Sequence, residues 1–158
     1  MTIIVLFLTP PAAAVELDQF IAELKDKSPE HDGVPLRAYR TEDVNHDGDL
    51  EVLEMINPIE ESAIGFLNVE LYPAFEWINV YKKKANNYLM ATEDFPNFLK
   101  NRKSFYLSWL KRLENPSGLG LDSQSLLKHN ASDFKRKLNG YIVRINNMLH
   151  SKRSSSIR

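Results

Sequence analysis

The sequence contains no cysteine in its 158 residues, so disulfide bonds and thiolate metal sites are excluded. A cysteine-free chain is compatible with the cytosol, the periplasm or a bacterial exterior. There is no G-x-S-x-G motif, so the sequence gives no sign of an α/β-hydrolase nucleophile. The apolar run at residues 3–8 is too short to span a bilayer.

Basic residues are missing from the start of the chain, where no Lys or Arg precedes Lys25. Residues 3–8 are nevertheless apolar, and the three alanines at 12–14 form an A-x-A pattern like that of a signal-peptide cleavage site. We therefore predict that residues 1–14 are a truncated or atypical signal peptide and that the mature chain begins at Val15. A buried strand at residues 2–8 is the alternative. The first reading predicts a periplasmic or secreted protein, the second allows a cytoplasmic one.

Charge is divided unevenly along the chain. Residues 1–78 carry 4 Lys or Arg against 16 Asp or Glu, and residues 79–158 carry 16 against 5. Such a split can mark a nucleic-acid face or an interaction tail. The basic residues are spread along helical faces, which favours two halves that pack together and neutralise each other. The run of lysines at 82–84 is typical of a solvated hairpin turn, so nucleic-acid binding is not expected.

Carboxylates are concentrated in the stretch DVNHDGDLEVLE at residues 43–54, which holds five of them. Neighbouring carboxylates repel one another and raise one another's pKa values, so the cluster is costly without a cation. Asp43, Asn45 and Asp47 stand two residues apart, and Gly48 permits a sharp turn after them. A hard dication such as Ca²⁺ takes six to eight oxygen ligands. The spacing therefore predicts a calcium site.

The stretch matches the pattern D-x-[DN]-x-[DN]-G-x5-E in full and so resembles an EF-hand loop. The resemblance implies oxygen ligands from six residues, with Asp49 contributing its main-chain carbonyl and Glu51 binding directly or through water. It also implies that the side chain of His46 points to solvent. The implied ligands are Asp43, Asn45, Asp47, Asp49, Glu51 and Glu54.

The flanks of the loop differ from an EF-hand, because Pro58 follows Glu54 by only four residues. A strand–loop–strand context over residues 36–92 resembles a single FG-GAP or VCBS-type propeller unit. Propellers repeat the unit several times, so one copy excludes a complete propeller. Such units usually have an apolar residue at the position of Glu54. Its role as a ligand depends on which resemblance applies.

Periodicity predicts an α+β fold: a small antiparallel sheet carrying the calcium loop, packed with an N-terminal helix and two C-terminal helices. One domain is expected over residues 15–150, with loop and sheet at 36–92 and a helical part at 95–150. Asn57 should cap a short helix that extends to about residue 65. Ser132 should cap the last helix, and residues 151–158 should be disordered. The remaining elements are expected as helices at 15–27 and 95–113, strands at 36–41 and 50–56, a hairpin at 76–82 and 88–92, and connectors at 28–33 and 116–123.

These features predict a non-enzymatic, extracytoplasmic module in which Ca²⁺ is structural, bound in the weak extracellular range of ~10⁻⁴–10⁻³ M. A protein partner would bind the basic C-terminal half, where the last helix carries Lys135, Arg136, Lys137 and Arg144. That helix could instead lie on a membrane surface, but core packing explains its apolar stripe better. The alternative function is a hydrolase or an enzyme accessory subunit. Its site would use Glu60, Glu61, Glu70, Glu76 or the histidines His31, His129 and His150.

Overall fold

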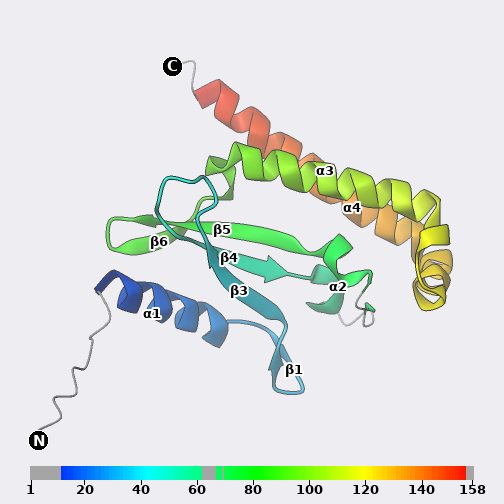
Figure 1. The fold of residues 1–158 in the computed structure, drawn as a ribbon, viewed down its shortest axis with the longest axis horizontal. Coiled ribbons are helices and arrows are strands. Elements are labelled where there is room, and N and C mark those ends of the chain that lie inside the picture. Colours follow the sequence, from blue (N-terminus) through cyan, green and yellow to red (C-terminus); the bar gives the residue numbers. More distant parts are fainter. Residues whose placement is uncertain (1–11, 62–66, 69, 156–158) are drawn as a thin grey trace, which may run out of the picture.

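A four-stranded antiparallel meander forms the centre of the fold (Figure 1). The structure is a computed structural model and describes residues 12–61, 67–68 and 70–155. The strands follow the chain in the order β3-β4-β5-β6, and each boundary lies within two residues of the predicted one. The α+β fold class and the strand, loop, strand, hairpin order are therefore confirmed. The strands are β3 (Arg37–Glu42), β4 (Glu51–Ile56), β5 (Trp77–Lys84) and β6 (Asn87–Met90).

One face of the sheet is covered by the N-terminal helix α1 (Ala12–Asp26). The ring of Phe20 lies edge-on to Tyr81 at a centroid distance of 5.4 Å and stacks on Tyr88 at 4.9 Å. The hydroxyl of Tyr39 donates to the carbonyl oxygen of Leu24 across 3.0 Å. These contacts attach α1 to strands β3, β5 and β6 through aromatic side chains.

The main hydrophobic core lies where α3 (Pro96–Glu114) and α4 (Leu121–Ser155) pack against the 3-10 turn η1 (Tyr72–Phe75). In Figure 1 the sheet lies between α1 and this helix pair. The buried side chains repeat at three- and four-residue spacing, which forms one apolar stripe on each helix. They are Leu99, Tyr106, Trp109 and Leu113 on α3, and Leu127, Phe134, Leu138, Tyr141 and Ile145 on α4.

Helix α4 begins twelve residues earlier than predicted, at Leu121 rather than after Ser132. The side chain of Glu70 supplies the cap, because it accepts hydrogen bonds from the backbone N–H of Gly120 and the hydroxyl of Ser123. Ser132 is an exposed residue inside the helix. The predicted N-cap at Ser132 was therefore wrong, and the connector predicted at 116–123 ends at residue 120, because the cap comes from a residue far away in the sequence.

The same helix continues to Ser155, into the segment for which we predicted disorder. Once a helix exists, each further residue adds a hydrogen bond without a new nucleation cost, so an end can extend without burial. Residues 156–158 lie outside the described part of the chain. In the part that is described, no helix combines the length and apolar character needed to cross a membrane.

A second, two-stranded sheet was not predicted. Strands β1 (Glu30–His31) and β2 (Val34–Pro35) are joined by Asp32 and Gly33, whose φ values are 51° and 75°. Two successive positive φ angles are typical of a type I′ hairpin turn, for which Asp-Gly is a favoured pair. The sequence carried this signal at residues 32–33, but the strands are too short to show alternation.

Asn57 caps α2 (Pro58–Glu61) as predicted, since its Oδ1 accepts the N–H of Ile59 across 3.2 Å. The predicted continuation to residue 65 falls on residues 62–66, outside the described part of the chain. Residues 1–11 of the predicted signal peptide also lie outside it. Residues 12–14 belong to the first turn of α1.

Candidate metal centre

The acidic loop is the direct connection between β3 and β4. Glu42 and Glu51 are register partners at the last rung of the two strands, so residues 43–50 close the hairpin between them. His46 and Gly48 have φ values of 61° and 93°, in the left-handed region. These two positions curl the chain, as the glycine at the sixth position of the pattern predicted. His46 is exposed, in agreement with the prediction.

The side chain of Asp43 organises the loop from inside. Its Oδ1 accepts the backbone N–H of Asp47 across 3.1 Å, and its Oδ2 accepts that of Gly48 across 3.0 Å. Asp47 in turn accepts the backbone N–H of Asp49 across 3.0 Å. A carboxylate oxygen has two lone pairs, so each of these oxygens keeps one acceptor position after bonding to an amide.

Asn45 also contacts Asp47, through a 2.7 Å hydrogen bond from its Nδ2 to Oδ2. The backbone N–H of Asp49, followed by the amide of Asn45, lowers the pKa of Asp47 below its ordinary value. Asp47 therefore stays ionised well into the acidic range. Asn45, Asp47 and Asp49 are all exposed at the rim of the loop.

Glu51 differs from the other acids because its side chain is fully buried, with 0 % of its surface exposed. Its Oε2 accepts the backbone N–H of Val44 across 3.0 Å. Within the described part of the chain, Oε1 has no hydrogen-bond partner. Burial, followed by repulsion from Asp47 and Asp43, raises the pKa of Glu51. A buried carboxylate oxygen without a donor is costly, and a cation would compensate that cost.

The loop side chains do not yet converge on one point. Among residues 12–61, 67–68 and 70–155, no group of three or more His, Asp or Glu side chains is placed to hold a metal ion. Asp43 and Asp47 are instead turned toward amide hydrogens of the loop. The all-oxygen donor set and the unpartnered oxygen of Glu51 fit a hard cation.

Glu54 lies apart from this group. It is three residues beyond Glu51 on β4 and therefore points to the opposite face of the sheet. Its side chain is 2 % exposed and accepts three hydrogen bonds. The donors are Arg37 to Oε1 at 3.0 Å, and Asn79 and Tyr81 to Oε2 at 2.9 and 2.8 Å. Glu54 is thus the centre of a polar network under α1, and no signal in the sequence identified these partners.

Among the acids of the alternative enzyme site, Glu70 and Glu76 have described side chains, and these two have different surroundings. Glu70 caps α4, and burial raises the pKa of Glu76, which stands just before β5. The side chains of Glu60 and Glu61 lie outside the described part. Nδ1 of His129 donates to the carbonyl oxygen of Ser125 on its own helix, across 2.8 Å.

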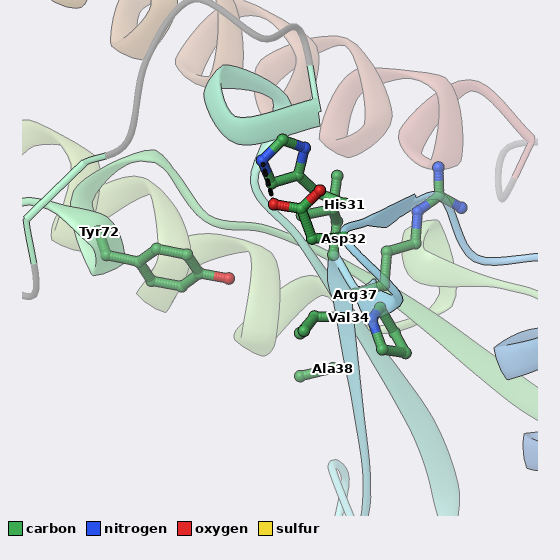
Figure 2. A pocket seen from close by; sticks show the side chains of 8 residues that line it. His31, Asp32, Val34, Arg37, Ala38 and Tyr72 are labelled. Atoms are coloured by element: carbon green, nitrogen blue, oxygen red, sulfur yellow. Dashed lines mark ion pairs between the residues drawn. The ribbon is translucent and has the colours of Figure 1, made fainter.

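His31 lies beside a cavity of about 390 Å³ (Figure 2). Its Nε2 is 3.6 Å from the carboxylate of Asp32, and Figure 2 shows the ring of Tyr72 on the other side of the cavity. The side chains of His31 and Asp32 are 55 % and 90 % exposed, so water screens the pair. Catalytic pairs are usually desolvated, and this one is not. The cavity is lined by His31, Asp32, Val34, Pro35, Leu36, Arg37, Ala38 and Tyr72.

No protein-family model matches the sequence, and searches of curated proteins and of solved structures likewise find no match. Function therefore has to be argued from the residues of the site and not from relatives.

Proposed function

We propose that residues 43–51 bind Ca²⁺ and that the protein is a non-enzymatic module whose fold the ion stabilises. The observation that supports this most is the carboxylate of Glu51, which is fully buried beside a D-x-N-x-D-G loop and has one oxygen without a hydrogen-bond partner among the described residues. The ligands would be the side chains of Asp43, Asn45, Asp47 and Glu51 and the main-chain carbonyl of Asp49. The ligand pattern is that of an EF-hand loop, placed between strands as in an FG-GAP or VCBS-type unit.

Glu54 is left out of this ligand set. Its two oxygens already accept three hydrogen bonds on the other face of β4. The propeller-type resemblance, in which this position is not a ligand, agrees with that placement.

The proposed role of the ion is electrostatic. Asp43, Asp47 and Glu51 repel one another, and this repulsion adds to the burial that raises the pKa of Glu51. A dication between them turns the repulsion into attraction and gives Oε1 of Glu51 a partner. Because the loop joins the last rung of β3 and β4, the ion would hold the ends of two central strands together.

The donor chemistry supports calcium over softer metals. Each proposed ligand atom is an oxygen, and the loop's only histidine, His46, is exposed. Oxygen ligands suit Ca²⁺ and Mg²⁺, whereas Zn²⁺ sites are built from His and Cys nitrogen and sulfur. A single loop with exposed acids would bind in the weak range of ~10⁻⁴–10⁻³ M, which extracellular calcium fills.

We also propose that the protein acts in the periplasm or outside the cell, after cleavage before Val15. The contacts that attach α1 to the sheet come from Glu16, Phe20 and Leu24, all of which a chain beginning at Val15 keeps. Mass spectrometry of the secreted or periplasmic protein should find Val15 as the first residue. An intact Met1 in that fraction would contradict the proposal.

A protein partner is proposed for the basic half of the chain. Arg136 and Arg144 on α4 are exposed, and Lys135 and Lys137 are half-buried, so the four cations lie along one long helix. Lys135 is paired with Glu114 and Arg136 with Asp133. An acidic partner surface would complement this helix and would be attracted to it at low ionic strength.

Calorimetric titration of Ca²⁺ into chelator-treated protein tests the metal site. Asp43→Ala and Asp47→Ala should each lose most of the affinity, because each removes a charged ligand. His46→Asn is the matched control, since it changes an exposed loop residue and Asn tolerates the positive φ. Unchanged titrations in either aspartate variant would overturn the proposal.

A further inference from the structure

A cleft of about 450 Å³ lies between α2 and the middle of α4, and none of the residues that line it belongs to the acidic loop at 43–51. The volume falls within the roughly 300–1,000 Å³ of small-molecule sites. Its apolar part comes from Ile59, Phe134 and Tyr141. The last two are 7 % exposed each, so the cleft reaches down to the hydrophobic core.

Gly140 lies in this cleft, near the middle of the 35-residue helix α4. Glycine inside a helix costs about 1 kcal/mol relative to alanine. A Cβ built on Gly140 would meet no heavy atom within 4 Å, so no close packing in the fold requires glycine. The missing side chain instead leaves the helix backbone open to the cleft. A bound molecule could approach it there.

Two cations flank this glycine on the same side of the helix, Lys137 three residues before it and Arg144 four residues after it. Arg144 lies over the ring of Trp77, with 4.1 Å between its Cζ and the ring centroid. In the described part of the chain, neither cation has a carboxylate partner. Asp133 also lines the cleft, but it is paired with Arg136 across 2.7 Å. As far as the described residues show, the cleft therefore carries unmatched positive charge beside an apolar floor.

We propose that this cleft binds a small amphipathic carboxylate. The apolar body lies on Phe134, Tyr141 and Ile59, against the open backbone at Gly140. The carboxylate lies between Lys137 and Arg144. An unbranched or aromatic acid of moderate size fits the charge and the volume, and this site is independent of calcium binding by residues 43–51.

Octanoate is the probe, titrated calorimetrically into the full chain, with 1-octanol as its uncharged counterpart. Saturable binding of one octanoate per chain is expected, with octanol at least tenfold weaker because it lacks the charge. Lys137→Glu should weaken octanoate binding about tenfold or more, since it replaces an attraction with a repulsion. Lys128→Glu is the matched control, because Lys128 is exposed on the same helix outside the cleft.

Gly140→Leu tests the apolar part, because its side chain would occupy the open space. It should abolish octanoate binding while the thermal melt stays cooperative, since leucine is a better helix former than glycine. Gly140→Ala, which adds one methyl group, should raise the melting temperature and reduce the affinity less. Absence of octanoate binding, equal binding of octanol, binding unaffected by Gly140→Leu, or equal losses in Lys137→Glu and Lys128→Glu would each overturn the proposal.

Discussion

The backbone N–H of Val44 donates to Oε2 of Glu51 across 3.0 Å, which ties the start of the acidic loop to the first residue of β4. This bond engages one carboxylate oxygen and leaves the other without a partner in the described part of the chain. Glu51 is therefore held in place by the fold before any ion binds. Four of the proposed ligands lie at the surface or near it, and Glu51 supplies the buried one.

Replacing Glu51 with glutamine should have opposite effects with and without calcium. The neutral amide removes a buried charge and its repulsion from Asp47 and Asp43, so the unfolding free energy of the chelated protein should rise. The same change removes a charged ligand, so the stabilisation by Ca²⁺ should largely disappear. Chemical denaturation with chelator and with Ca²⁺ measures both effects. A variant that keeps the full calcium stabilisation would exclude Glu51 as a ligand.

The stability of the chelated protein should depend on pH through Glu51. Its pKa in the folded state is raised above the ordinary 4.5, so the protonated form favours folding. This contribution is complete below the unfolded pKa and is lost as the pH rises through the folded pKa. The pKa of Asp47 is lowered from its ordinary 3.8, so its contribution to stability is instead lost as the pH falls below that value. The range above pH 4.5 therefore isolates the groups with raised pKa values.

Glu76 also has a raised pKa, so the difference between wild type and Glu51→Gln is the quantity to measure. Melts in chelator from pH 4.5 upward should show a steeper loss of stability in the wild type. Parallel curves would contradict the assignment of the raised pKa to Glu51.

Glu54→Gln should destabilise the fold without weakening calcium binding. The change removes the charge that Arg37 pairs with and disturbs the bonds from Asn79 and Tyr81. Loss of one partner from a buried pair costs about 3 kcal/mol. The melting temperature should fall, while the affinity for Ca²⁺ at a temperature where the variant is folded stays within about twofold of wild type. A large loss of affinity would return Glu54 to the ligand set.

Ala85→Gly should stabilise the β5–β6 hairpin. Ala85 has a φ of 54°, in the left-handed region where an L-residue with a Cβ is strained by roughly 1–2 kcal/mol. Glycine removes this strain but increases the entropy of the unfolded chain, so a net gain of about 0.5–1 kcal/mol is expected. Ala91→Gly is the control, because Ala91 has a φ of −143° and gains nothing from glycine. Equal effects of the two substitutions on unfolding free energy would contradict the argument.

The sheet and the acidic loop could be predicted because their signals are local. The aliphatic and β-branched residues at 50–56, the Asx–Gly spacing of the loop and the apolar stripe of α3 each lie within one short segment. The start of α4 could not be predicted in this way. The buried face of α4 continues toward its N-terminus through Leu127 to Ser123, which is polar although it is buried. The cap of α4 is the side chain of Glu70, which is distant in the sequence. Ser132 resembles a cap in sequence but lies inside the helix.

The composition of the candidate site was predicted only in part. Asp43, Asn45 and Asp47 lie in one loop, so their proximity followed from the spacing. The separation of Glu51 from Glu54 depends on the face of β4 to which each points, and the network around Glu54 joins side chains from β3, β4 and β5. The unpartnered oxygen of Glu51 is a property of the folded chain and has no counterpart in the sequence pattern.

A thermal melt of wild type and Asp43→Ala, each in chelator and in about 10 mM Ca²⁺, tests the central claim most directly. With a dissociation constant near ~10⁻⁴ M, this concentration should stabilise the wild type by about 2.7 kcal/mol. For a chain of this size, that corresponds to a rise in melting temperature of roughly 5–10 °C. Asp43→Ala should show little or no rise. A wild-type melting temperature that is the same in chelator and in Ca²⁺ would contradict calcium binding by the acidic loop.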